Sequence, residues 1–462
     1  MHGGVILFRG TGADARRYVE ADRSRADDYY LGADASVAEF AALDGEGNVT
    51  ATLGLQPEAY SAWVDWVNPL TGESTGKPRL PGDGRRGSPR FAEMIVNTPK
   101  SLSIAAALHP EVSEALDQAQ RGAVAEIQRW LAQHAVTRVG PRGKQEIVPI
   151  GQMQVVGITH RTSRAGDPHR HIHFQIGTRV WAAGKWRALD TAALFKQQGA
   201  IRALGTAVIA AHPELAEVLD RHGLTLDPVT GEVVELEQFN PVMSKRGEQV
   251  RKHLERFEAN WEAAHPGETM GPVVSAKLAA KAWAYERPAK KPTTLGEEQA
   301  WVTELREAGY DPETLRRPAR RIPVSLDDLS VQTVASRALD RCAARASAWT
   351  RHTVQEHVTR IMTECGVQAS PDEVREFVSI ATSLAMEDCF SILPTGVPAP
   401  EHVAHLTSVR VVQAETELRD LIAARVPKRE SKHPDVREPG GRGASMPGRS
   451  APLLRSPPAI HW

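Results

Sequence analysis

Residues 157–180, GITHRTSRAGDPHRHIHFQIGTRV, place three histidines in two β-prone apolar runs. The runs are joined by residues 166–168, Gly-Asp-Pro, which are turn formers. In a β-hairpin, His171 and His173 would project from the same face of one strand, and His160 would lie beside them on the other. Three imidazoles would then converge and leave coordination positions open, as catalytic metal sites require.

Length and composition exclude several classes of protein. The chain has 462 residues, enough for two or three domains, with 41% hydrophobic and 24% charged residues, as in soluble globular proteins. It has no apolar run of about 18 residues and no secretory signal at its N-terminus, so we expect no membrane segment. Its three cysteines are widely spaced and odd in number, which indicates a reducing, cytoplasmic setting.

Positive charge gathers around the predicted hairpin, although the net charge is only -1. Residues 157–205 hold eight Lys or Arg and only two Asp. Such a local excess suits a phosphate backbone. The candidates for phosphate contacts, each of which could also be an ordinary solvated charge, are Lys100, Arg161, Arg164, Arg170 and Arg179.

The order of the predicted elements indicates an α+β fold with an antiparallel β-sheet and flanking helices. Hydrophobic periodicity predicts helices over 13–21, 112–131 and 191–211, and strands over 5–8 and 91–96. The segment VWAAGKWRAL adds a further strand with a turn at Gly184. The expected units are a sheet domain over 1–240, a charged helical linker over 241–294, an α-helical region over 295–425 and a disordered, Pro/Gly/Arg/Ser-rich tail over 426–462.

Several motifs along the first 240 residues resemble one family. They are Tyr18, the pair Tyr29–Tyr30 in DDYY, the segment EMIVNTPKS before a helix, the histidine hairpin and its continuation in WRALD. Their order and spacing resemble the MobF/TrwC-type conjugative relaxases of the HUH endonuclease superfamily. The resemblance implies a relaxase/Rep-like HUH fold. It also implies nicking and rejoining of single-stranded DNA at an origin of transfer, through a 5′-phosphotyrosyl intermediate.

The resemblance also implies roles for the site residues. His160, His171 and His173 would hold one divalent metal ion (Mg, Mn, Zn or Ni); imidazole ligands suit Zn, Ni, Co or Mn better than Mg. Glu93 stands where family members have Asp, and would orient a ligand histidine or assist deprotonation of a tyrosine; a solvated strand residue is the plain alternative.

The tyrosines depart from the family pattern, because Val19 rather than a second tyrosine follows Tyr18. We expect Tyr18 to be the first nucleophile, Tyr29 the second and Tyr30 a packing residue. The roles of Tyr18 and Tyr29 could also be exchanged.

Three other functions remain open. They are a rolling-circle replication initiator with the same chemistry, a metal hydrolase in which the histidines activate water, and a non-catalytic, truncated DNA-binding remnant. Beyond single-stranded DNA, the resemblance implies relaxosome accessory proteins and the coupling protein of a type IV secretion system as partners. Because no phosphate-binding loop follows, we expect a short form that lacks the usual C-terminal helicase.

Two minor patterns complete the predictions. Trp63 and Trp66 could stack on extruded bases or belong to the core. His352, Glu356 and His357 do not have the spacing of a zinc-protease motif, and we expect them on a helix surface.

Overall fold

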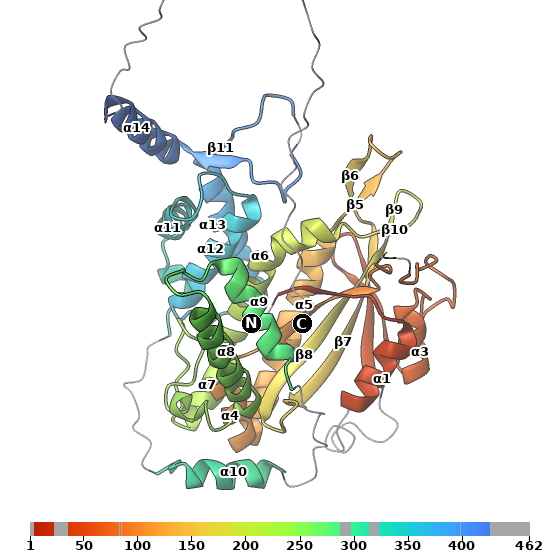
Figure 1. Cartoon of the computed structure of the whole chain (residues 1–462), viewed down its shortest axis with the longest axis vertical. Helices are drawn as coiled ribbons and strands as arrows, with labels where there is room; N and C mark the ends of the chain where they lie inside the picture. Colours follow the sequence, from red (N-terminus) through yellow and green to blue (C-terminus); the bar gives the residue numbers. More distant parts are fainter. Residues whose placement is uncertain are drawn as a thin grey trace, which may run out of the picture.

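The computed structural model describes residues 4–22, 36–82, 84, 86–286, 297–313, 323–397 and 399–425. Its centre is an eight-stranded sheet with the order β1-β4-β8-β7-β2-β3, to which β9 adds beside β7 and β10 beside β9. Figure 1 shows β7 and β8 side by side in this sheet. All strand pairs in this sheet are antiparallel. The strands are β1 (Ile6–Phe8), β2 (Ala38–Asp44), β3 (Val49–Leu55), β4 (Phe91–Asn97), β7 (Gln152–Thr162), β8 (Pro168–Gly177), β9 (Arg179–Ala182) and β10 (Lys185–Ala188).

Helices cover both faces of the sheet and form most of the C-terminal third. They are α1 (Gly12–Asp22), α3 (Pro57–Val64), α4 (Lys100–Leu108), α5 (Pro110–His134), α6 (Thr191–Ala210), α7 (Pro213–Arg221), α8 (Lys245–Ala264), α9 (Pro272–Ala284), α10 (Glu297–Glu307), α11 (Val331–Ala343), α12 (Arg351–Glu364), α13 (Pro371–Glu387) and α14 (Val409–Arg425). Two short hairpins complete the fold, β5 (Val136–Val139) with β6 (Glu146–Pro149) and β11 (Cys389–Ser391) with β12 (Leu406–Ser408). Among the described residues, no helix has both the length and the apolar character needed to cross a bilayer.

The two faces of the sheet pack against different helices. Side chains alternate along each strand, so β8 turns Ile172, Phe174 and Ile176 to one face. These residues belong to the main core, together with α4, α5 and α6. The opposite face contributes Val156 and Ile158 of β7 to a smaller core with α1 and α3. The histidines of β7 and β8 share this second face.

The β7–β8 hairpin is held at its loop end. His160 pairs with His171, and the register shifts by a bulge before Thr162 pairs with Pro168, which has no N–H to donate. The connecting loop is tied to the later helices, because the Lys245 Nζ lies 3.1 Å from an Asp167 carboxylate oxygen. The Trp301 indole N–H also donates to the Gly166 carbonyl over 2.9 Å. Contacts from α8 and α10 therefore anchor the loop that joins the two histidine-bearing strands.

The C-terminal helices pack directly on the sheet domain. Helix α12 lies along α6, and buried residues of α11, α12 and α13 join the same core as α5 and α6. Arg375 of α13 also contacts the buried Glu126 of α5 through one nitrogen, at 2.7 and 2.8 Å from the two carboxylate oxygens. The predicted unit boundaries near residues 240 and 295 stay predictions, but the main core extends across both.

The structure confirms the predicted α+β class with an antiparallel sheet and flanking helices. The predicted strands over 5–8 and 91–96 correspond to β1 and β4, and the predicted helices to α1, α5 and α6. The segment VWAAGKWRAL forms the β9–β10 hairpin, in which Ala183 (φ 47°) and Gly184 (φ 75°) both adopt left-handed conformations. Strands β2 and β3 were not predicted. The predicted disordered tail, residues 426–462, lies outside the described residues.

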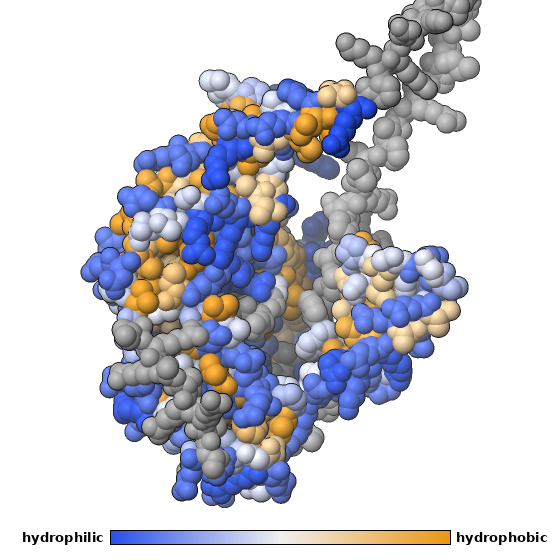
Figure 2. Space-filling view, turned by 90° about the vertical axis from the view of Figure 1, so that its left-hand side faces the viewer, coloured by the Kyte–Doolittle hydropathy of each residue, from blue (hydrophilic) through white to orange (hydrophobic). Residues whose placement is uncertain are grey.

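One face of the molecule is mainly hydrophilic, with scattered apolar side chains, and is hollowed near its middle (Figure 2).

Candidate functional site

The three predicted metal ligands converge on the sheet face beneath α1. Their ring centres are 5.4 Å apart for His160 and His171, 5.2 Å for His160 and His173, and 5.1 Å for His171 and His173. Imidazoles that bind one zinc-like ion through nitrogens ~2.1 Å away, at tetrahedral angles, would have ring centres about 5.2 Å apart. The spacing of the three rings therefore fits a shared divalent ion.

Neighbouring acceptors fix the orientation of two of these rings. The Nδ1 of His171 lies 2.9 Å from the carbonyl oxygen of His169, and because a carbonyl can only accept, Nδ1 donates. The Nδ1 of His173 lies 3.1 Å from a carboxylate oxygen of Glu93. The bond to His169 puts the proton of His171 on Nδ1, and the Glu93 carboxylate favours the same form of His173, which leaves the Nε2 lone pairs to coordinate a metal.

Burial keeps His171 in the form that a metal needs. The pKa of His171 is lowered well below its usual value, first because the ring is buried, and then by the nearby His169, His173 and His160 rings. The neutral imidazole therefore predominates, which is the ligand form.

Glu93 is a buried residue, so the alternative prediction that it is a solvated strand residue is wrong. It is 8% exposed and projects from β4 between His173 and Gln175. The Gln175 amide donates to the second Glu93 oxygen over 2.9 Å, and the Tyr60 hydroxyl donates to the Gln175 carbonyl oxygen over 2.9 Å. This relay from α3 holds the carboxylate against the His173 ring.

Of the three predicted catalytic tyrosines, the structure locates the backbone of one. Tyr18 belongs to α1, whose Ala15 and Val19 pack in the same small core as Val156 and Ile158. Helix α1 therefore covers the face that carries the histidines. Tyr29 and Tyr30 lie outside the described residues, and the choice of nucleophile stays a prediction.

The predicted DNA contacts fall into two groups near the hairpin. Arg161 and Arg170 both bind Asp117 of α5, at 2.9 and 3.0 Å, and the Arg170 side chain is only 7% exposed. Lys100, at the start of α4, donates to the Pro168 carbonyl over 2.8 Å. Arg164 is partly exposed in the hairpin loop. Whether these residues contact DNA stays a prediction.

Arg179 lies at the other end of β8, beside Trp66. Its guanidinium is 5.0 Å from the centre of the Trp66 ring and donates to the Thr75 and Trp186 carbonyls. Trp66 is partly exposed, whereas Trp63 is 4% exposed and stacks with Phe91. Trp63 is therefore a core residue, and of the two tryptophans only Trp66 has a partly open ring.

A second histidine cluster was not predicted. His134, His352 and Glu401 place one nitrogen or oxygen each within 4.8 Å of the others. The expectation that His352 and His357 lie on a helix surface is wrong, because they are 2% and 1% exposed. The side of α12 that carries His352 packs against α6. A local sequence pattern cannot predict a contact with a residue as distant in sequence as His134.

Comparison with known proteins gives one family and a set of solved structures. The family described as TrwC relaxase matches residues 12–308, more than half of the chain. Among curated proteins, nothing matches.

Several of the similar structures are complexes of one relaxase. A metal-free complex of the conjugative relaxase TrwC with OriT DNA is 22% identical, with a TM-score of 0.48, and the match covers 67% of this chain and 99% of that one. A metal-bound complex has the same identity and coverage and a TM-score of 0.47. A complex of TrwC with a 27-mer DNA comprising the recognition hairpin and the cleavage site is 21% identical at the same coverage, with a TM-score of 0.47. On the family match, the chain belongs to the TrwC relaxase family of conjugative DNA-nicking enzymes.

Proposed function

We propose that this protein cuts and rejoins one strand of single-stranded DNA at a specific site in an origin of transfer, through a tyrosine–phosphate link. One observation carries the proposal. In a chain of the TrwC relaxase family, three imidazoles converge on one sheet face, with a buried carboxylate against one of them. The same face is covered by the helix that carries Tyr18.

His160, His171 and His173 would hold one divalent ion, and neutral imidazoles leave its positive charge undiminished. When bound, such an ion polarises the scissile phosphate and stabilises charge that develops on its non-bridging oxygens. An all-imidazole set favours Zn, Ni, Co or Mn over Mg.

The reaction conserves the energy of the phosphodiester. The phenol oxygen of Tyr18 attacks the scissile phosphorus and gives up its proton to solvent; the new Tyr–O–P bond replaces the bond from phosphorus to the 3′ oxygen, which takes up one proton as it leaves. The products are a 5′-phosphotyrosine and a free 3′-hydroxyl. Attack by that hydroxyl in the reverse direction restores the strand and frees the tyrosine. Tyr29 would serve as the nucleophile for a second transfer.

Glu93 would act by positioning. Its contact with His173, supported by Gln175 and Tyr60, holds the ring at one orientation and favours its Nδ1–H form. Glu is one methylene longer than the Asp of related enzymes. The hydrogen bond from Gln175 holds this longer side chain in one position.

The proposed DNA path follows the basic residues around the hairpin. Lys100 and Arg164 lie near its loop and Arg179 near the opposite end of β8, beside the partly exposed Trp66 ring. Relaxosome accessory proteins and a secretion coupling protein remain predicted partners.

A covalent adduct tests the proposal directly. Purified chain is incubated with labelled single-stranded DNA from its own element and a divalent metal, and then denatured. We expect a protein–DNA adduct that maps by mass spectrometry to one tyrosine, and whose yield falls in Tyr18→Phe.

The Tyr18→Phe, Tyr29→Phe, Tyr30→Phe triple variant separates the proposal from its rivals. Cleavage that persists in this variant would indicate a metal hydrolase, and oligonucleotide binding without cleavage or adduct in the wild type would indicate a non-catalytic remnant.

A further inference from the structure

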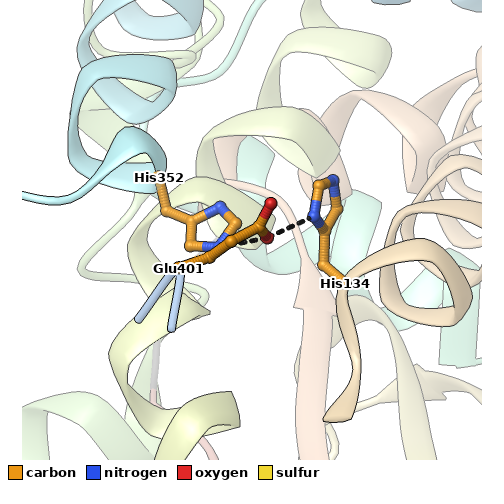
Figure 3. Close-up of side chains that lie close together, drawn as sticks. All are labelled: His134, His352 and Glu401. Carbon is orange, nitrogen blue, oxygen red and sulfur yellow. Dashed lines mark hydrogen bonds and ion pairs between the residues drawn. The ribbon is translucent and has the colours of Figure 1, made fainter. Parts of the chain in front are cut away.

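His134, His352 and Glu401 converge at the junction between the sheet domain and the C-terminal helices (Figure 3). His134 is the last residue of α5, His352 lies in the first turn of α12, and Glu401 lies between β11 and β12. A Glu401 carboxylate oxygen is 3.0 Å from His134 Nδ1 and 3.4 Å from His352 Nε2. Three elements distant in sequence thus present one donor atom each to the same point.

The neighbouring Gln197 defines the state of His352. The Gln197 side-chain nitrogen lies 3.2 Å from the His134 carbonyl oxygen, which can only accept, so this atom is the amide NH₂. The same nitrogen lies 3.2 Å from His352 Nε2. Because an amide NH₂ only donates, Nε2 carries a lone pair and no proton.

This arrangement directs two lone-pair atoms at each other. The unprotonated His352 Nε2 and the Glu401 carboxylate oxygen are 3.4 Å apart, with no proton available between them. Burial of His352, which is 2% exposed, also disfavours protonation of the ring. A cation between the two atoms removes their repulsion.

We propose that His134, His352 and Glu401 form a second divalent cation site, separate from the histidines of the sheet. Two imidazole nitrogens and one carboxylate oxygen are a ligand set that suits a zinc-class ion. The Glu401 side chain is 54% exposed, so the open side of the site admits water as a further ligand. The Trp130 ring, 4.5 Å from His134 and 5.1 Å from His352 between ring centres, packs beside both imidazoles.

The ion would cross-link three segments of the chain. It would bind the segment that carries Glu401 to the ends of α5 and α12, and so join the C-terminal helices to the sheet domain. The site holds no basic residue or tyrosine of the proposed nicking chemistry, so its loss should leave nicking unchanged.

Hydrogen exchange measured by mass spectrometry on the full chain tests whether the ion orders the segment around Glu401. The protein is stripped of metal, and exchange of peptides that span residue 401 is followed with and without Zn²⁺. With free Zn²⁺ at ten times the dissociation constant, opening of this segment should slow about tenfold in the wild type.

Two variants make the test specific. Glu401→Gln keeps the size of an exposed side chain but removes the charged ligand, and should abolish the zinc effect and lower the zinc content by one ion per chain. Glu376→Gln, the same change at an exposed position of α13, should behave as the wild type.

Two results would overturn the site. One is exchange at residue 401 that does not respond to Zn²⁺ in the wild type, which would leave a metal-free His–Glu contact. The other is an equal response in wild type and Glu401→Gln, which would place the ion elsewhere.

Discussion

The two histidine clusters of this protein use similar side chains but are built in opposite ways. His160, His171 and His173 come from adjacent strands of one hairpin, and hydrogen-bonded pairing of the strands sets their spacing. His134, His352 and Glu401 come from three elements, and His134 and Glu401 are 267 positions apart in sequence. The spacing of residues within one hairpin determines the first cluster. The second cluster forms only when elements distant in the sequence pack together.

The clusters also differ in what their loss should affect. The sheet cluster is buried on the face of the sheet against which α1 packs, and its supporting groups are Glu93 and Gln175. The junction cluster is open on the side of Glu401. Removal of a ligand from the first should act on chemistry, and removal from the second on local order.

The largest expected effect separates the two clusters by activity. His171→Ala removes one proposed ligand from the sheet cluster and should lower the rate of nicking by about 10³-fold, which corresponds to about 4 kcal/mol of transition-state stabilisation. His134→Ala should leave the rate within about twofold of wild type, since it lies in the other cluster. The measurement is single-turnover cleavage of a labelled oligonucleotide, with circular dichroism to confirm folding. Comparable losses in both variants would refute the division of roles.

A smaller effect should follow from the carboxylate behind His173. Glu93→Gln keeps the shape of the side chain but weakens its hold on the His173 Nδ1–H, and should reduce nicking about 10–100-fold. Glu93→Asp tests the added methylene, because a shorter side chain would withdraw from Gln175. If Glu93→Gln nicks at the wild-type rate in the same assay, the carboxylate does not position the ring.

The junction can also be weakened without touching either cluster. Arg375→Ala leaves the buried Glu126 with Arg129, 3.3 Å away, as its remaining ion-pair partner among the described residues. We expect the free energy of unfolding to fall by about 1–3 kcal/mol, with nicking unchanged at temperatures where the protein is folded. Urea titration measures the change, and Arg337→Ala on α11, which is exposed, serves as the control.

The smallest effect concerns pH and the DNA path. The pKa of Lys100 is lowered to about 8, first because the amine is buried; Asp167 opposes this shift and the nearby Lys245 adds to it. The charged amine, which is the proposed phosphate contact, is therefore lost as pH rises through about 8. Between pH 7 and 9.5, the slope of log affinity for single-stranded DNA against log salt should become shallower by about 0.7, the value of one phosphate contact.

Lys100→Arg is the matched control, because its guanidinium stays charged throughout this range. Fluorescence anisotropy at several salt concentrations gives the slopes. An equal change of slope in the variant would mean that Lys100 is not the residue that titrates.

What the sequence could predict follows from the range of the interactions. The hairpin, the turn at Gly184 and the long helix α5 were predicted, since spacing within a few residues sets each of them. Strands β2 and β3 were not, because β3 exposes Val49 and Leu53 to solvent and lacks a clean alternation of buried and exposed residues.

The same limit applies to the site. Glu93 could be selected from its motif, but its contact with His173 depends on β4 pairing with β8, which no local pattern specifies. His352 was assigned to a surface because the helices that bury it, α5 and α6, lie far earlier in the chain. Residues such as these acquire their surroundings only through tertiary packing.

The alternation of side chains along β8 makes this strand sensitive to insertions and deletions. Deleting one codon between His173 and Ile176 forces one end of the strand to slip by a position. Either the imidazoles turn toward α5, or the apolar residues beyond them turn toward α1. Loss of a single residue there should be more damaging than most exchanges of one residue for another, while the connection at 163–167 can change length without reversing either face.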